Sequence, residues 1–238
     1  MNILQKIVAH KRKEVAEHKE LYPLRLLERS IYFDTPTVSL QKYLTRQDKA
    51  GVIAEFKRRS PSKGDIQPYA QVEKVSIGYM QAGASALSIL TDSHFFGGKN
   101  EDLRTARQFN FCPILRKDFI IDEYQLVEAR SIGADVILLI AEVLEKDELK
   151  RLAAFAHTLG LEVLMELHSA AQLPKINEHI DIVGINNRNL NDFTVDIQTS
   201  LELAKQLPQD MIRISESGIR KPAEAALLKK NGFHGFLI

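Results

Sequence analysis

An α/β fold, a (β/α)8 TIM barrel, is predicted by three features of this 238-residue sequence. Eight short segments are rich in β-branched and aliphatic residues, and stretches with helical periodicity separate them. The spacing between successive strands is close to the ~30 residues of a βαβ unit. Eight such units need about 250 residues, so residues 1–238 are expected to form one domain.

A doubly wound open sheet would show the same alternation of strands and helices. Such sheets commonly bind nucleotides through a glycine-rich loop. The sequence has no G-x-G-x-x-G after its first predicted strand and no G-x-x-x-x-G-K-[ST] anywhere. We therefore favour the closed barrel.

The predicted strands are mostly continuous apolar runs, which is typical of buried parallel strands. They are Val52–Phe56, Ala86–Leu90, Pro113–Arg116, Val136–Ile140, Glu162–Leu167, Ile182–Asn186, Met211–Ser215 and Gly235–Ile238. The predicted helices between them are Tyr69–Gln81, Glu101–Phe109, Glu123–Ser131, Lys146–Leu159, Ser169–Ile176, Ile197–Gln206 and Pro222–Lys230. Residues 1–50 are expected to be an N-terminal helical extension, with an amphipathic helix first and a second helix near Ser39–Arg46.

Composition argues against several classes of partner. With 32 basic and 31 acidic residues, the chain has no overall field that would attract nucleic acid or an anionic membrane. The apolar run Val136–Ala141 is far shorter than the roughly 20 residues of a membrane helix. The single cysteine, Cys112, is expected to be a buried thiol, and no metal-ligand spacing occurs. We predict a cytoplasmic protein with no metal or other cofactor.

Ionisable residues end several of the predicted strands. Glu55 and Lys57 are two residues apart, so they share one face of the first strand. Because an unpaired buried charge is costly, the pair is expected at the carboxyl end of the barrel, where active sites of this fold lie, although a structural ion pair is the alternative. Lys117 and Glu166 end the third and fifth strands. These four groups together predict acid–base chemistry without a metal, whereas His168 is more typical of a loop or cap.

Two loops are candidates for binding an anion. The segment 58–64, R-R-S-P-S-K-G, is basic and carries hydroxyl groups. Gly218 follows the seventh strand, and a glycine there lets backbone N–H groups approach phosphate oxygens. Arg188, after the sixth strand, could add a charged donor. An ordinary turn or a solvated loop is the alternative for each.

Four motifs together resemble the indole-3-glycerol phosphate synthase family over essentially the whole chain. They are V-I-A-E-F-K-R-R-S-P-S-K-G-D-I, P-I-L-R-K-D-F, G-I-N-N-R-N-L and I-S-E-S-G-I, in this order. The resemblance implies closure of 1-(2-carboxyphenylamino)-1-deoxyribulose 5-phosphate to an indole, with loss of CO2 and water. The expected partner is thus a small phosphorylated substrate, and the chain is expected to be a monomer or weak homo-oligomer.

The resemblance also implies a role for each matching residue. Lys117 would be the general acid and Glu166 the general base. Lys57 would contact the departing carboxylate and assist dehydration, with Glu55 holding this lysine and substrate hydroxyls. Asn186 would orient Glu166, and Ser217 would position the substrate.

The remaining implied roles concern substrate binding. Gly218 would bind phosphate through its backbone, Ser60 would lie near the anthranilate carboxylate, Arg188 would be a supporting cation and Glu216 an outer partner. Four apolar residues would hold the anthranilate ring. They are Phe96, Leu115, Phe119 and Leu138.

The sequence departs from the family pattern in one respect. It stops at Ile238, within the eighth predicted strand and before the family's glycine-rich phosphate loop and last helix. We expect a truncated eighth βα unit and a longer natural protein. Two other functions stay open: another phosphosugar barrel enzyme, either an isomerase or a Schiff-base aldolase, and a non-catalytic barrel subunit.

Overall fold

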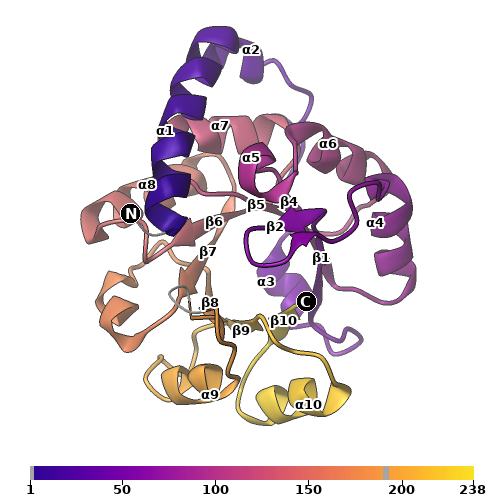
Figure 1. Cartoon of the computed structure of the whole chain (residues 1–238), viewed down its shortest axis with the longest axis vertical. Coiled ribbons are helices and arrows are strands. Elements are labelled where there is room, and N and C mark those ends of the chain that lie inside the picture. Colours follow the sequence, from indigo (N-terminus) through magenta and orange to yellow (C-terminus); the bar gives the residue numbers. More distant parts are fainter. Residues whose placement is uncertain (1–2, 190–192) are drawn as a thin grey trace.

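A computed structural model of the chain describes residues 3–189 and 193–238. Eight parallel strands close into a barrel in the order β1-β10-β9-β8-β7-β6-β5-β4, which confirms the predicted fold (Figure 1). The barrel strands are β1 (Val52–Phe56), β4 (Ala86–Leu90), β5 (Ile114–Lys117), β6 (Val136–Ile140), β7 (Glu162–Leu167), β8 (Ile182–Asn186), β9 (Arg213–Glu216) and β10 (Gly235–Leu237). Five of the eight coincide with their predicted bounds because continuous apolar runs mark both ends of a buried strand.

Helices follow the strands and cover the outside of the barrel (Figure 1). They are α4 (Val72–Gln81), α6 (Asn100–Phe109), α7 (Glu123–Ser131), α8 (Lys146–Thr158), α9 (Gln198–Ala204) and α10 (Pro222–Lys230). The predicted helix Ser169–Ile176 is instead a 3-10 helix, η1 (Ala170–Lys175), which contains Pro174. A proline inside a helix has no N–H to donate, so a regular α-helix is disfavoured there.

Short elements within the loops were not predicted. A two-stranded antiparallel hairpin, β2 (Arg59–Ser60) and β3 (Gly64–Asp65), occupies the basic segment after β1. A single helical turn, α5 (Ser93–Phe96), follows β4 and is capped by the Asp92 carboxylate, which accepts from the backbone N–H of Phe95 and Phe96. These elements are too short to show a hydrophobic period, which is the signal that finds longer ones.

The N-terminal extension packs against both ends of the barrel. Helix α1 (Ile3–Leu21) lies across the face where the strands end, and α2 (Leu24–Leu27) follows it (Figure 1). Helix α3 (Leu40–Leu44) lies at the opposite end, where the backbone N–H of Leu40 donates to Glu162 at the start of β7. Ile7 of α1 and Leu40 both belong to the apolar cluster that fills the barrel interior.

The inward faces of the strands change from apolar to ionisable toward their carboxyl ends. Side chains two residues apart share a strand face and stand about 7 Å apart. In four strands an apolar inward residue is followed two positions later by a charged one. The pairs are Ile53 and Glu55, Leu115 and Lys117, Leu164 and Glu166, and Ile214 and Glu216. The interior is therefore a dry core with a charged upper layer.

Two predictions from composition can be compared with the structure. Cys112 is buried, as expected, and burial raises the pKa of its thiol to about 11. In residues 3–189 and 193–238, no helix combines the length and the low polarity that crossing a membrane requires.

Candidate active site

Lys117 and two glutamates form the centre of the charged layer. Its Nζ donates to Glu166 Oε2 at 2.9 Å and to Glu216 Oε2 at 3.3 Å, although the three residues come from β5, β7 and β9. The Glu166 and Glu216 side chains are almost completely buried, and that of Lys117 is 15% exposed. One cation thus bridges two carboxylates within a nearly dry space.

A second ion pair stands beside this centre. Lys57 Nζ donates to Glu55 Oε1, and the hydroxyl of Ser88 on β4 donates to Glu55 Oε2 at 3.5 Å. Lys57 is the most exposed of these charged groups, so it faces incoming solutes. We call Glu55, Lys57, Lys117, Glu166 and Glu216 the acid–base cluster. Three carboxylates and two ammonium groups leave it one negative charge in excess when all are ionised.

The cluster separates the pKa values of its members. Burial alone would lower the pKa of Lys117, but the three carboxylates raise it well above its usual value. Burial would raise the pKa of Glu166, yet Lys117 and His168 hold it well below its usual range. Burial, together with repulsion from Glu166, raises the pKa of Glu216 to about 7 despite the attraction of Lys117. The site therefore holds an ammonium group, a carboxylate and a third group that titrates near neutrality.

Glycine at one strand position makes room for Glu216. A Cβ added at Gly184 on β8 would lie 2.1 Å from Glu216 Oε1, a distance that real side chains do not tolerate. This oxygen is buried and has no hydrogen-bond partner among the described residues. A buried unpartnered carboxylate oxygen is costly and therefore rare, and a catalytic role is one of the few reasons for keeping it. Sequence reasoning did not single out Gly184, because a strand glycine alone indicates only a close approach.

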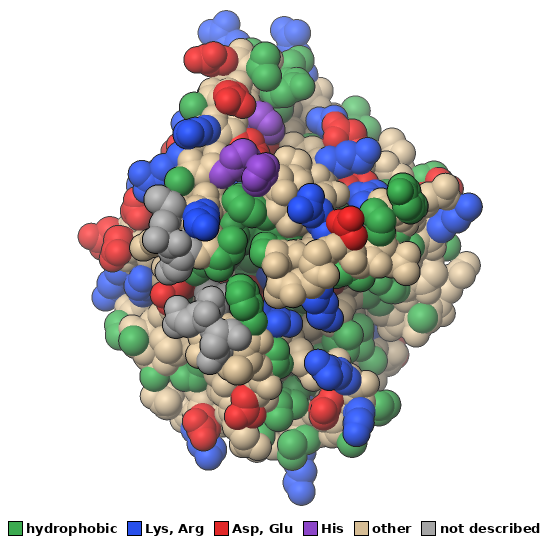
Figure 2. All heavy atoms as spheres, viewed as in Figure 1, with side chains coloured by type: hydrophobic (Ala, Val, Ile, Leu, Met, Phe, Trp, Pro, Cys, Tyr) green, Lys and Arg blue, Asp and Glu red, His purple; other side chains and the backbone are tan. Residues whose placement is uncertain are grey.

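A cavity of about 220 Å³ opens above the cluster. Figure 2 shows it as a hollow near the middle of this face, where hydrophobic side chains gather and basic side chains lie close by. The rings of Phe96 and Phe119 lie on its apolar side with centroids 5.9 Å apart, beside Leu138. Such a wall fits a flat aromatic ring, while the charged floor fits polar groups.

The loops after β8 and β9 form the other side of the cavity. Ser217 has φ 68°, which is unusual for a residue with a side chain, and Gly218 follows with φ 80°. Asn187 holds the two loops together, since its Nδ2 donates to Ser215 Oγ at 2.9 Å and to the Ser217 carbonyl at 3.0 Å. The backbone N–H of Arg188 donates to Asn186 Oδ1 at 3.0 Å. The strained turn is thus held by specific contacts, which is a common property of ligand-binding loops.

Twelve of the fourteen residues that the sequence singled out line this cavity. They are Glu55, Lys57, Ser60, Phe96, Lys117, Phe119, Leu138, Glu166, Asn186, Arg188, Glu216 and Ser217. Leu115, expected in the ring wall, is not among the lining residues: it lies one inward position below Lys117, in the apolar cluster that also contains Phe119 and Leu138. Gly218 does not line it either, since it packs against Val195 behind Ser217.

Two further placements qualify the sequence interpretation. Arg58 of the basic segment binds Asp102 on α6 through both guanidinium nitrogens, one at 2.9 Å, so it is engaged away from the cavity. Glu216, expected to be an outer partner, contacts Lys117 directly. Both differences follow from tertiary contacts that residue spacing along the chain does not encode.

Sequence reasoning missed the contribution of α1 to the cavity. Ile3, Leu4 and Ile7 line it, and all three lie on one side of the helix. Their spacing at i, i+1 and i+4 is a signal of an apolar helix face, but it does not reveal what that face covers. Among residues 3–189 and 193–238, no group of three His, Cys, Asp or Glu side chains could hold a metal ion.

Comparison with known proteins gives consistent results. The model of a family described as indole-3-glycerol phosphate synthase matches residues 4–238. A protein of that name from Bacteroides thetaiotaomicron is 52% identical over 237 residues, which cover 100% of this chain and 91% of that protein. One from Dechloromonas aromatica is 42% identical over 241 residues and covers 100% and 92%.

Solved structures share the fold at lower identity. A structure of the tryptophan synthase complex from Pyrococcus furiosus has a TM-score of 0.60 and 15% identity, covering 80% of this chain and 88% of that chain. The N-acetylmannosamine-6-phosphate 2-epimerase from Clostridium perfringens has a TM-score of 0.61 and 15% identity, covering 80% and 86%. At this identity the likeness concerns the barrel alone.

Proposed function

Because the chain belongs to the indole-3-glycerol phosphate synthase family, we propose that it closes 1-(2-carboxyphenylamino)-1-deoxyribulose 5-phosphate to indole-3-glycerol phosphate. The observation that carries this proposal is the contact of Lys117 with Glu166 and Glu216 beneath a cavity with one aromatic wall. An ammonium group and a carboxylate at 2.9 Å can serve as acid and base for one small substrate.

The proton balance of the reaction defines what the cluster must do. The ketone oxygen gains two protons and leaves as water, the methylene carbon beside the nitrogen loses one proton, and the carboxylate leaves as CO2 without a proton. One proton is therefore taken up from solvent in each turnover. A site for this reaction needs an acid, a base and a route for that proton.

Lys117 and Glu166 are proposed as this acid and base. Lys117 would carry its proton before the reaction, because three carboxylates raise the pKa of its ammonium group. It would protonate the ketone oxygen as the aromatic carbon attacks. Glu166 is ionised, because Lys117 and His168 lower the pKa of its carboxyl, and it would remove the methylene proton during dehydration. Asn186, at the end of the neighbouring strand β8, would orient Glu166 and the substrate.

Lys57 and the loops are proposed to bind the two ends of the substrate. Lys57 would hold the departing carboxylate and assist dehydration, with Glu55 fixing its position and Ser60 nearby. The turn at Ser217 and Gly218 would bind the phosphate, with Arg188 as a supporting cation. Anchoring the phosphate holds the ring carbon close to the ketone, which lowers the entropic cost of ring closure.

The test is a fluorescence assay with the carboxyphenylamino substrate. The chain contains no tryptophan, so a newly formed indole should fluoresce against a weak protein background. Steady growth of indole fluorescence is the expected result. A flat trace, with substrate binding still detectable by calorimetry, would support the non-catalytic barrel instead.

A Schiff-base enzyme is the competing chemistry. It requires a neutral lysine amine, whereas the carboxylates around Lys117 favour its ammonium form. Borohydride added during turnover should therefore leave Lys57 and Lys117 unmodified in mass spectra of their peptides. A covalent substrate adduct on either lysine would reject the acid–base assignment.

The proposal extends to the setting of the enzyme. We propose a cytoplasmic protein that works without a metal or other cofactor, binds no nucleic acid and is a monomer or weak homo-oligomer. The near-equal numbers of acidic and basic residues and the single buried thiol support this setting. Light scattering at several protein concentrations would measure the mass.

A further inference from the structure

His168 is a buried titratable group that the proposed mechanism leaves without a task. It follows directly after β7, two residues beyond Glu166, and its side chain is only 8% exposed. Its Nε2 stands 3.2 Å from Glu166 Oε1. This contact is close but poorly aligned, and neither ring nitrogen has a hydrogen-bond partner among the described residues. Burying imidazole nitrogens without hydrogen-bond partners costs free energy, so packing alone does not explain why a histidine occupies this position.

A second cavity lies on the far side of His168. It measures about 430 Å³ and is mostly polar. His168, Glu142, Arg188 and Asp196 are among the residues that line it. Glu166 lines the substrate cavity and not this one, whereas His168 lines this one and not the substrate cavity. The two cavities adjoin at Ile3, Leu4, Asn186 and Arg188, and the imidazole stands between the proposed base and the second cavity.

We propose that His168 relays protons between Glu166 and water in this second cavity, so that the base is reset by a route the substrate does not block. This inference rests on the proposed function, in which Glu166 receives a proton in every turnover. His168 Nε2 would accept that proton from Glu166 while Nδ1 releases one to water, and a ring flip restores the starting tautomer. Because this route returns one proton to water, both protons gained by the ketone oxygen come from solvent, and the net uptake stays at one. Imidazole suits this task because one nitrogen accepts while the other donates.

The surroundings hold His168 in place without using its ring. Its backbone N–H donates to Gln172 Oε1 at 2.7 Å, and Gln172 in turn donates to Glu142. Charged groups face the ring from several elements. They are Glu166 of β7, Glu216 of β9, Lys117 of β5, and Glu142, Arg188 and Asp196 around the second cavity.

These charges set the protonation of the ring. Burial alone would lower the pKa of His168, but contact with Glu166, together with the field of Glu216, raises it above the usual value, against the effect of Lys117. The ring then binds a proton readily near neutrality. Because it acts through Glu166 and touches no substrate, His168 is a positioning residue for proton return rather than a reacting group.

The test separates the first turnover from later ones. In His168→Asn, enzyme with ionised Glu166 should form its first equivalent of indole within about twofold of the wild-type rate, because the reacting groups are intact. Later turnovers should be slower by about tenfold or more, since proton return then limits the rate. KM should fall with kcat, so that kcat/KM is nearly unchanged. Rapid mixing with indole fluorescence would show this as a burst.

Rescue and a matched control complete the design. Imidazole added to His168→Ala should restore steady turnover in proportion to its concentration, and a salt at equal ionic strength should not. His179→Asn, at a histidine in the loop before β8 at the opposite end of the barrel, should behave as wild type. An unchanged steady rate in His168→Asn would refute the relay, and so would equal slowing of the first and later turnovers without rescue. Failure of the wild-type enzyme to turn over would refute the proposed function instead.

Discussion

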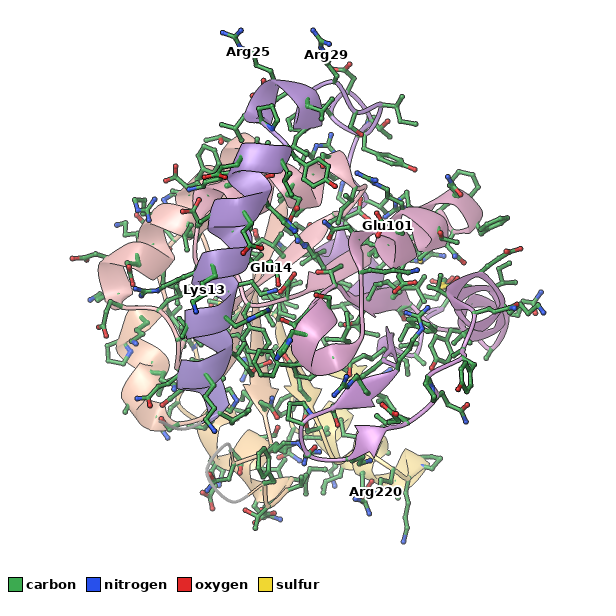
Figure 3. The ribbon with its side chains drawn as sticks, turned by 45° about the horizontal axis from the view of Figure 1, so that its top comes forward. Lys13, Glu14, Arg25, Arg29, Glu101 and Arg220 are labelled. Atoms are coloured by element: carbon green, nitrogen blue, oxygen red, sulfur yellow. The ribbon has the colours of Figure 1, made fainter. Side chains whose placement is uncertain are left out.

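Two clusters of buried charge lie at the same end of this barrel, and they differ in what their carboxylates do. The acid–base cluster faces the substrate cavity. The second cluster, here called the α1 network, fastens α1 to the barrel and consists of Lys11, Glu14, Asp92, Arg116, Asp118 and Glu128. Figure 3 shows α1 lying over the barrel, with Lys13 and Glu14 labelled on it.

A single strand supplies both clusters. In β5 and the residue after it, Lys117 points into the barrel and binds Glu166, while Arg116 and Asp118 bind each other outside the acid–base cluster, although Asp118 also borders the cavity. This alternation is the ordinary period of a strand. Outward Asp118 binds Lys11 Nζ at 2.9 Å, and Arg116 binds Glu128 of α7. Thus, in the segment I-L-R-K-D, Arg116 and Asp118 bind residues of the α1 network, while Lys117 is the proposed acid of the substrate cavity.

Protonation distinguishes the two clusters. In the α1 network burial opposes ionisation, but Lys11 and Arg116 hold the pKa of Asp118 far below its usual value, and Arg116 and His18 lower that of Glu128 to about 2. Both carboxylates remain ionised near neutrality. In the acid–base cluster the pKa of Glu216 is instead raised to about 7. Buried charge alone is therefore a poor marker of an active site, whereas a carboxylate shifted toward neutrality is a better one.

The largest expected effect concerns Lys117. Lys117→Met removes the proposed acid, so kcat should fall by about 10²- to 10⁴-fold, the usual contribution of a group that transfers a proton in the transition state. Indole fluorescence at saturating substrate measures the loss, and circular dichroism checks that the fold is retained. Lys205→Met, at an exposed position after α9, is the matched control. A rise in KM at unchanged kcat would reassign Lys117 to substrate binding.

Lys11 should matter to stability. Its Nζ lies 2.8 Å from Glu14, 3.0 Å from Asp92 and 2.9 Å from Asp118, and its side chain is 1% exposed. Lys11→Met leaves buried carboxylates without their cation, which should lower the free energy of unfolding by about 3–5 kcal/mol. Lys19 is on the same helix as Lys11 and forms an exposed ion pair with Asp122, the N-cap residue of α7. Lys19→Met should lower the free energy of unfolding by less than about 1 kcal/mol. Equal losses in urea unfolding would mean that α1 is not anchored by this network.

The sequence predicted one of these clusters well and the other not at all. Glu55, Lys57, Lys117 and Glu166 could be placed together because each follows an apolar strand, and the ends of parallel strands meet at one face. The α1 network joins α1 to residues about one hundred positions away, for which no local pattern exists. The strand period predicts that Leu115 points into the barrel, but it does not predict that this side chain lies below the cavity.

Glu216→Gln should change how stability depends on pH. The usual pKa of this carboxyl is 4.5 and the folded state raises it to about 7, so the folded protein binds more protons between these values. The stabilising contribution of Glu216 is fully present below about pH 4.5 and is lost as the pH rises through about 7. Between about pH 5 and pH 8 the free energy of unfolding of the variant should therefore rise relative to that of the wild type. The rise should be a few kcal/mol at most, since one pKa unit is about 1.4 kcal/mol.

The measurement is urea unfolding of both proteins across this range. Glu101→Gln, at an exposed position on α6, is the matched control (Figure 3). Parallel stability curves for wild type and Glu216→Gln would show that Glu216 does not exchange its proton in this window. Below about pH 4.5 the free energy of unfolding should fall for a different reason. The pKa of Glu166 is lowered in the folded state, so its ionised form stabilises the fold, and this contribution is lost as Glu166 becomes protonated.

The smallest expected effect lies at the solvent edge of the α1 network. His18 Nδ1 stands 3.0 Å from Glu128 Oε1, and this hydrogen bond raises the pKa of the imidazole against the effect of partial burial. A raised pKa means that the pair stabilises the fold below the usual histidine value and that this contribution is lost as the pH rises through the folded value. Because the side chain is 31% exposed, His18→Gln should cost under about 1 kcal/mol near pH 5.5 and almost nothing near pH 9. An equal loss near pH 9 and near pH 5.5 would show that His18 acts through packing with Tyr22, whose ring it meets edge-on at 5.9 Å, and not through its charge.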